Sequence, residues 1–537
     1  MFSYIIRNGY ILNGTGKSSF KADVAITDGL ISLIGKGLDG AGRNEIDATG
    51  LVVAPGFIDM HSHSDISLFF EPHAQSKIMQ GVTTEVVGNC GITSAPVRAI
   101  HKAALLRLFE TNNFTIKASE KELWNWPSQM DHMKDLVEKG VSSNLVPLVG
   151  GVPLRVAAAG MKEHLEPQEL DVIKMLLQKE LRQGIWGMSS GLYYIPGSHF
   201  NREELIELCR VIRENNAIWA VHMRDEGQRL FAAVDEVIDI AHRSRVSLQI
   251  SHLKLEGKSN WGRAADLLAR LDRARAEGVD VHWDQYPYTA YGSGLVDAIP
   301  PEWRAGGVDQ VLSRLHDKQF TNSLRQAMLH GTETWRSPLE EIQIEKIIVT
   351  EVKNNPEYAG KTIGELATTW QREPVDAILR LLITQEGSVK VVVPAMFEED
   401  VELIMQHPDT MISSDGKAVS PRGRYAQLHP HPRYYGAFPR VLGRYVREKG
   451  ILDLPEAIRK MTSLPANRLG LKDRGTIAEG QAADIVILNP KTVVDRATFE
   501  QPSQFPQGIE YVFVNGDLVV EEGEHTGRYP GRLLKRQ

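Results

Sequence analysis

The residues of this chain that are best suited to chemistry are metal-binding types that lie where strand-like apolar runs end. Five of them closely follow such runs, and a cysteine in a glycine-flanked turn is a further candidate. These six residues are His61, His63, Cys90, His222, His252 and Asp415. Imidazole nitrogen, thiolate sulfur and carboxylate oxygen are ligands that Zn²⁺ prefers in proteins. Because their joint placement at several strand ends is improbable by coincidence, the pattern predicts a metal site.

Each candidate also has a simpler interpretation. A single histidine is more often an ordinary core or surface residue than a ligand, and Cys90 alone would fit a small buried side chain. His61 and His63 lie one residue apart after the same run, and because side chains alternate along a strand, both point to the same side. The metal interpretation therefore depends on the whole set.

The elements that must position these residues alternate between strand-like runs and helical patterns, as in βαβ units around a parallel sheet. Eight runs are expected to form strands, at residues 56–60, 83–87, 144–149, 184–189, 217–221, 246–251, 279–284 and 410–414. Eight such units predict an α/β fold with a TIM-like (β/α)₈ barrel. The C-terminal ends of its strands meet at one rim, where the chemistry of such barrels takes place.

Two segments fall outside this repeat. Residues 291–352 fit no βα unit and predict a lid or substrate-binding insertion over the barrel mouth. A further apolar run at residues 389–393 is a candidate ninth strand, so the strand assignment in this region stays open.

Short strands at both chain ends predict a second, smaller domain. They flank Asn8-Gly9, Asp28-Gly29 and Asn515-Gly516, and such dipeptides favour hairpin turns. We expect the two ends to meet in one small β-sandwich. The expected division of the chain is residues 1–54 and 470–537 for this domain and residues 55–469 for the catalytic barrel.

Composition narrows the class of protein. The net charge of −7 arises from 61 basic and 68 acidic residues among 537, without a block of like charges, which argues against a nucleic-acid partner. No apolar run approaches the roughly 18 residues that a membrane span requires. With two cysteines, of which Cys209 fits a helix core, and no signal-peptide pattern at the start, we expect a cytoplasmic protein. An oligomer is possible, but no pattern favours a particular state.

Several motifs resemble one enzyme family. The string APGFIDMHSHSD at residues 54–65 closely resembles the first-strand motif of the amidohydrolase superfamily. Others resemble motifs of its N-acyl-D-amino-acid deacylases, also called D-aminoacylases: GNCG at 88–91, SHLK at 251–254, YPY at 286–288, SDG at 414–416 and HPHPR at 429–433. The resemblance runs nearly end to end and implies zinc-dependent hydrolysis of N-acyl-D-amino acids to a carboxylate and a free D-amino acid.

The resemblance also implies an arrangement of ligands. Cys90 would bridge the metals, His222 and His252 would complete one zinc site, and the other three candidates would line a second, so one or two ions are possible. Many superfamily members instead bridge their metals with a carboxylated lysine from the fourth strand. The run at residues 184–189 contains no lysine, and Cys90 would fill this deficit.

Amide hydrolysis assigns roles to four residues. Zinc lowers the pKa of bound water and polarises the scissile carbonyl, while Asp415 takes the water proton and delivers it to the leaving amine. Alternatively, Asp415 is only a ligand. Arg433, Lys254 and Tyr286 offer a bidentate fork, a compact charge and a phenolic donor, and the resemblance implies that they bind the substrate carboxylate. Their simpler interpretations are a surface salt bridge for Arg433 and packing or solvation for the other two.

Two rival functions share much of this pattern. A cyclic-amide hydrolase of the dihydropyrimidinase or dihydroorotase kind has the same barrel and metals, but the missing fourth-strand lysine counts against it. A non-catalytic scaffold with this fold would be expected to lack ligands, yet all candidates are present. The D configuration rests wholly on the resemblance. An inserted segment at residues 418–428 leaves the shape of the side-chain pocket open.

Overall fold

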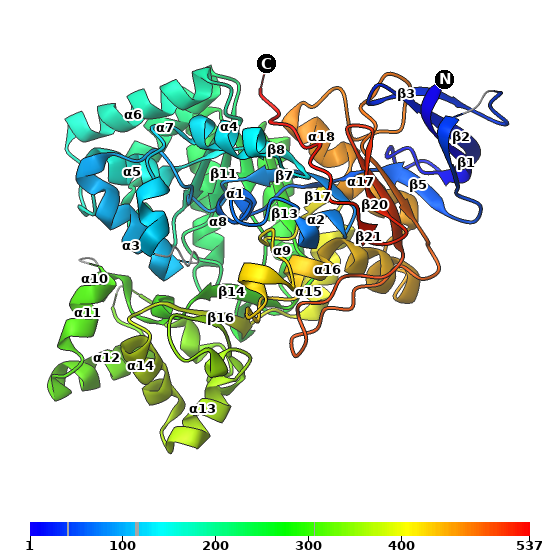
Figure 1. Cartoon of the computed structure of the whole chain (residues 1–537). Helices are drawn as coiled ribbons and strands as arrows, with labels where there is room; N and C mark the ends of the chain where they lie inside the picture. The colour runs from blue at the N-terminus through cyan, green and yellow to red at the C-terminus, as the bar shows by residue number, and fades with distance from the viewer. Residues whose placement is uncertain (40–41, 113–117, 305–306, 334, 537) are drawn as a thin grey trace.

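The computed structural model of the chain describes residues 1–39, 42–112, 118–304, 307–333 and 335–536. A barrel lies at the centre of the molecule, with a helical lobe on one side and a large β-sheet on the other (Figure 1). Within the described part of the chain, no helix is both long enough and apolar enough to cross a membrane.

The predicted (β/α)₈ barrel is confirmed. Its strands are β6 (Phe57–Asp59), β7 (Val82–Val87), β8 (Asn144–Pro147) continued by β9 (Val149–Gly150), β10 (Gly187–Gly191), β11 (Ile218–His222), β12 (Ser247–Ile250), β13 (Val281–Gln285) and β17 (Thr410–Ile412). They pair in parallel in the orders β6-β7-β8 and β9-β10-β11-β12-β13-β17. A parallel bridge between Ser62 and Gly416, just beyond β6 and β17, closes the barrel on the side of the candidate ligands.

Amphipathic helices cover the outside of the barrel because each has one apolar stripe to bury. They include α4 (Gln129–Lys139), α5 (Gly151–Ala159), α6 (Pro167–Arg182), α7 (Arg202–Glu214), α8 (Leu230–Ser244), α9 (Ala264–Ala276), α15 (Glu398–Gln406), α16 (Arg433–Arg440), α17 (Leu454–Met461) and α18 (Ser463–Leu469). Helix α7 begins with a capping box in which Asn201 and Glu204 each accept a hydrogen bond from the other's backbone N–H. Its inner face buries Cys209 completely, as predicted for a core residue.

Between β13 and β17 the chain leaves the barrel and forms the helical lobe seen at the lower left of Figure 1. The lobe contains an antiparallel sheet in the order β14 (Ala290–Gly294), β16 (Val389–Pro394) and β15 (Ile348–Val352). Its helices are α10 (Pro301–Arg304), α11 (Val308–Arg314), α12 (Lys318–His330), α13 (Ile363–Trp370) and α14 (Pro374–Thr384). The candidate ninth strand at residues 389–393 is therefore β16, a strand of the lobe that pairs with no barrel strand.

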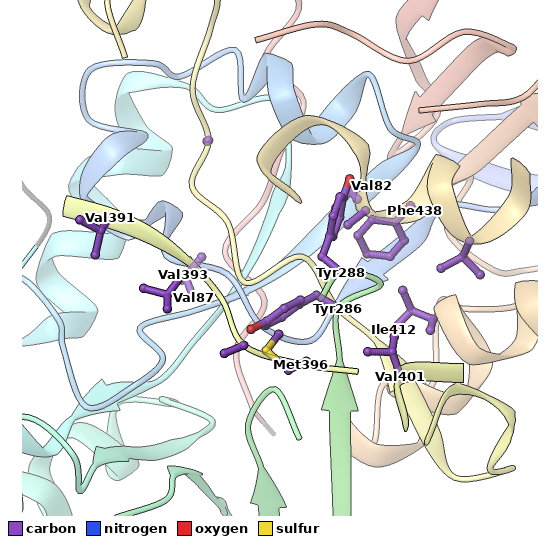
Figure 2. Close-up of a cluster of buried hydrophobic side chains, with 14 of the residues drawn as sticks. Val82, Val87, Tyr286, Tyr288, Val391, Val393, Met396, Val401, Ile412 and Phe438 are labelled. Atoms are coloured by element: carbon purple, nitrogen blue, oxygen red, sulfur yellow. The ribbon is translucent and has the colours of Figure 1, made fainter. Parts of the chain in front are cut away.

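A cluster of apolar side chains fixes this small sheet to the barrel. Figure 2 shows Val391 and Val393 of β16 in the same buried cluster as Tyr286 and Tyr288, which follow β13. All four side chains are 2–4% exposed. Because burial of a large apolar side chain contributes roughly 1.5–3 kcal/mol, this shared cluster helps to hold the lobe at the barrel rim.

The strands of the two chain ends form one hydrogen-bonded sheet, in which the blue and red strands of Figure 1 lie side by side. These strands are β1 (Phe2–Ile11), β2 (Phe20–Thr27), β3 (Leu30–Gly35), β4 (Gly42–Asp47), β5 (Val52–Pro55), β18 (Ile485–Leu488), β19 (Ile509–Val514), β20 (Asp517–Glu521) and β21 (Glu524–His525). The antiparallel pair β5-β18 joins the N-terminal strands to the C-terminal ones.

Two of the three predicted hairpin turns are present, at Asp28-Gly29 and Asn515-Gly516, with positive φ at each of the four residues. The prediction for Asn8-Gly9 is wrong, because β1 continues through both residues and its register with β2 shifts between Ile6 and Gly9. Asn8, with φ of 61°, lies in a β-bulge. A left-handed residue suits a bulge as well as a turn, so the dipeptide alone did not distinguish the two.

Candidate metal centre and active site

The structure brings all six predicted ligands together at the C-terminal rim of the barrel. His61 and His63 follow β6, Cys90 follows β7, and His222 ends β11. His252 and Asp415 follow β12 and β17. The donor atoms form three overlapping groups, each within 4.8 Å: His61, His63 and Cys90; Cys90, His222 and His252; and His61, His252 and Asp415.

Cys90 and Asp415 connect the histidines. The Cys90 Sγ atom lies 3.3 Å from Nε2 of His61 and 3.3 Å from Nε2 of His252. On the other side, Oδ1 of Asp415 lies 3.2 Å from Nε2 of His63 and 3.5 Å from Nε2 of His61. The thiol and the carboxylate are therefore placed to be shared between neighbouring ligand groups.

The backbone is strained where it aims three of these side chains. Cys90, His252 and Asp415 have φ values of 52°, 40° and 47°, a left-handed conformation that costs about 1–3 kcal/mol for such residues. Nearby hydrogen bonds hold it. The Asp415 N–H donates to the His61 carbonyl at 2.9 Å, and the His252 N–H donates to Oδ1 of Asp284 at 3.0 Å. Strain of this kind, held by specific contacts, is typical of functional sites.

The chemistry of the donors fits a divalent cation. Burial lowers the pKa of His61, His222 and His252 well below the ordinary imidazole value, so these rings are neutral and can act as ligands. Burial raises the pKa of the Cys90 thiol, which would need a nearby cation to lose its proton. The Nδ1 atom of His222 is buried, and no residue in the described part of the chain forms a hydrogen bond with it. A soft cation such as zinc would satisfy these donors together.

Glu226, which the sequence analysis missed, connects the outer nitrogens of two candidate ligands. Its Oε1 atom lies 3.1 Å from Nδ1 of His252, and its Oε2 atom lies 3.5 Å from Nε2 of His222. Oε2 also accepts a hydrogen bond from Nζ of Lys254 at 2.6 Å. Carboxylates in this position orient metal-binding imidazoles. The feature of the sequence that could have identified Glu226 is its position four residues after His222.

Asp415 lies beside a strong cation. Burial alone would raise the pKa of Asp415, but Arg433 and the histidines lower it well below the ordinary carboxyl value. The Arg433 Nη1 atom lies 2.9 Å from Oδ2 of Asp415. The carboxylate is therefore ionised and can accept a proton or bind a cation.

Arg433, Lys254 and Tyr286 form one group on the wall beside the ligands. The guanidinium of Arg433 lies 4.6 Å and the ammonium of Lys254 5.8 Å from the centre of the Tyr286 ring. The Tyr286 hydroxyl is buried and has no hydrogen-bond partner among the described residues. Arg433 is 5% exposed, so its alternative as a surface salt bridge is wrong. Two positive charges and a phenolic donor suit a substrate carboxylate.

These groups line a cavity of about 810 Å³, which includes space open to solvent. Other lining residues include Tyr193, Tyr291 and Lys390, of which the last two come from the helical lobe. The inserted segment at residues 418–428 lies wholly within the described residues, and none of its side chains lines this cavity.

Comparisons with known proteins agree with this geometry. Residues 44–138 and 382–520 match the amidohydrolase family model. The N-acyl-D-glutamate deacylase of Alcaligenes xylosoxydans xylosoxydans is 36% identical, with coverage of 99% of this chain and 96% of the relative.

Solved structures resemble the whole chain. A crystal structure of N-acyl-D-glutamate deacylase from Bordetella bronchiseptica, complexed with zinc and a phosphonate mimic of the tetrahedral intermediate, has a TM-score of 0.83 and 33% identity, with 99% of each chain covered. A D-aminoacylase structure concerned with the role of a binuclear metal centre has a TM-score of 0.82 and 32% identity, with 100% of each chain covered. The chain belongs to the N-acyl-D-amino-acid deacylase family of the amidohydrolase superfamily.

Proposed function

We propose that this chain is a zinc-dependent deacylase that hydrolyses N-acyl-D-amino acids to a carboxylate and a free D-amino acid. The main support is the convergence of six metal-binding side chains beneath a cavity whose wall carries Arg433, Lys254 and Tyr286. The D configuration is inferred from the relatives, whose names specify N-acyl-D-glutamate and D-aminoacylase.

The six donors would hold one or two zinc ions, with Cys90 shared between the groups. Zinc at this place supplies Lewis-acid activation of water and of the scissile carbonyl. Asp415 accepts the proton of the attacking water on its carboxylate and then donates it to the leaving amine nitrogen, which would otherwise depart as an unstable anion. Arg433 keeps this carboxylate ionised before the reaction.

The remaining polar groups of the wall bind the substrate. Arg433, Lys254 and the hydroxyl of Tyr286 receive its α-carboxylate and so fix the amide relative to Asp415. Lys254 also donates a hydrogen bond to Glu226. Burial by itself would lower the pKa of Lys254, but the Glu226 carboxylate raises it above its ordinary value. The lysine therefore stays a cation at neutral pH and can attract an anionic substrate.

The rival functions have less support. Strand β10 contains no lysine that carbon dioxide could convert to a bridging carboxylate, which disfavours a cyclic-amide hydrolase of the dihydropyrimidinase kind. The complete set of donors disfavours a non-catalytic scaffold. A cytoplasmic location stays a prediction from the sequence.

A panel of three substrates tests the proposed function. With zinc-loaded protein, N-acetyl-D-glutamate should be cleaved with a kcat/KM at least about 100-fold above that of the L isomer and of the matching amide without an α-carboxylate. Arg433→Ala should raise KM strongly for the D substrate but change KM little for the amide without an α-carboxylate, because only the former loses a charged partner. Since Arg433 also keeps Asp415 ionised, kcat should fall for both compounds. Equal rates for the D and L isomers would refute the stereochemical assignment, and no cleavage of any N-acyl amino acid would refute the function.

A further inference from the structure

We propose that Lys390 binds an acidic side chain of the substrate, so that this chain prefers N-acyl derivatives of D-glutamate or D-aspartate to those of neutral D-amino acids. The inference rests on the proposed function, because it names the substrate class of the same cavity. Lys390 lies in β16 of the helical lobe, lines the cavity and is 6% exposed.

The register of the small sheet sets the direction of Lys390. In the antiparallel pair of β14 and β16, Lys390 lies opposite Gly294, and cross-strand partners share one face of a sheet. Val391 and Val393 belong to the opposite face and are buried in the apolar cluster of Figure 2. Lys390 therefore points away from that cluster, on the same face as Gly292 and Gly294.

Two glycines on this face lie against two cations. A Cβ atom built on Gly292 would lie 3.4 Å from Nη2 of Arg433, and one built on Gly294 would lie 3.4 Å from Nζ of Lys390 and 3.3 Å from Oδ2 of Asp297. Residues two apart on a strand are about 6.6 Å apart, so the two cations lie beside neighbouring positions of one strip of backbone. Glycine within a strand often marks a place where a ligand approaches the backbone closely.

A dicarboxylic amino acid fits this pair of cations. If Arg433 takes the α-carboxylate, a side-chain carboxylate whose carbon lies about 4–5 Å further along can reach Lys390. Charge-assisted hydrogen bonds of about 2.7–2.9 Å then complete the span. A neutral side chain could form no charge-assisted hydrogen bond with Lys390, so the dicarboxylic substrate gains the stronger contact.

Two carboxylates near Lys390 also pair with other groups. The carboxylate of Asp297 is near, but it also accepts hydrogen bonds from Nη1 of Arg304 at 2.8 Å and from Oγ of Ser293 at 2.7 Å. Glu351, the other nearby anion, pairs with Lys417 at 3.8 Å. Burial lowers the pKa of Lys390 to about 7, and an arriving carboxylate would stabilise its charged form.

The test compares N-acetyl-D-glutamate with N-acetyl-D-glutamine, which has the same shape without the side-chain charge. Zinc-loaded wild-type protein should favour the glutamate substrate in kcat/KM. Lys390→Met should reduce the ratio of the two kcat/KM values at least about 10-fold, whereas Lys390→Arg should keep most of it. Lys353→Met, which removes an exposed lysine of the lobe that pairs with Glu386 and is not among the lining residues, is the control and should leave the ratio near the wild-type value.

An unchanged ratio in Lys390→Met, or an equal loss with both substrates, would overturn the proposal and make Lys390 a structural residue. If wild-type protein cleaves N-acetyl-D-glutamine as well as N-acetyl-D-glutamate, the substrate class is wrong while the deacylase function stands. If neither is cleaved, the proposed function fails by itself. Calorimetric binding of both compounds to the zinc-loaded protein then tests Lys390 separately, and equal affinities would contradict it.

Discussion

Asp415→Asn is expected to reduce kcat at least about 1,000-fold while the fold and the bound metal remain, because general acid–base catalysis contributes about 10²–10⁴-fold. Asparagine keeps the shape of the side chain and one oxygen near His63, but it cannot accept the water proton or return it to the amine. The Asp415 carboxylate also lies 2.9 Å from Nη1 of Arg433, so the neutral asparagine loses this ion pair as well. Steady-state kinetics with N-acetyl-D-glutamate and metal analysis of the same sample measure both effects.

Glu256→Gln is a suitable control, since Glu256 is another carboxylate that lines the cavity but belongs to none of the three donor groups. This variant should lose less than about 10-fold in kcat, as expected for a carboxyl group that takes no part in proton transfer. Near-normal turnover of Asp415→Asn with a full metal content would refute the catalytic role and leave Asp415 a ligand.

Cys90→Ala is expected to weaken zinc binding at least about 100-fold and to abolish most activity at limiting zinc. Cys90 supplies the sulfur donor of two of the three donor groups, and its Sγ atom lies 3.3 Å from histidines on both sides. Alanine leaves the space open and supplies no donor, so the two groups are no longer connected. Zinc titration of metal-free variant protein, with the bound metal measured after dialysis, gives the affinity.

The chain offers a matched control for this variant in its second cysteine. Cys209 is fully buried on the inner face of α7, in an apolar core cluster. It belongs to none of the three donor groups. Cys209→Ala should lower the free energy of unfolding slightly, as a small core deletion does, without changing zinc affinity. Equal zinc affinity of Cys90→Ala and wild-type protein would show that the thiol is a packing residue.

The barrel could be predicted because its strands are buried on both faces and so read as apolar runs. Features that depend on pairing between strands distant in the sequence could not be predicted. Residues 389–393 have the same apolar pattern as a barrel strand, yet they pair with β14 and β15 in the lobe. Asn8-Gly9 likewise has the composition of a turn but lies within β1, which has partner strands on both sides of this dipeptide. The domain boundaries at residues 54 and 469 stay predictions.

The candidate ligands could be found because strand ends of a barrel converge, and this rule converts positions in the sequence into proximity. The residues that support them could not be found in this way. Glu226 lies in the loop after β11 and contacts His252 from the next strand. Lys390 reaches the cavity from the lobe, and only the pairing of β16 with β14 gives its direction. Both depend on how separate elements meet, which no local pattern records.

The proposed catalysis requires a cation shared among these imidazoles, the thiol and the carboxylate, so the most direct test measures activity as a function of added zinc. Protein stripped of metal by a chelator should not cleave N-acetyl-D-glutamate, and activity should return in proportion to bound zinc at no more than two equivalents per chain. Cleavage by protein shown to be free of metal, or zinc bound without any return of activity, would contradict the account.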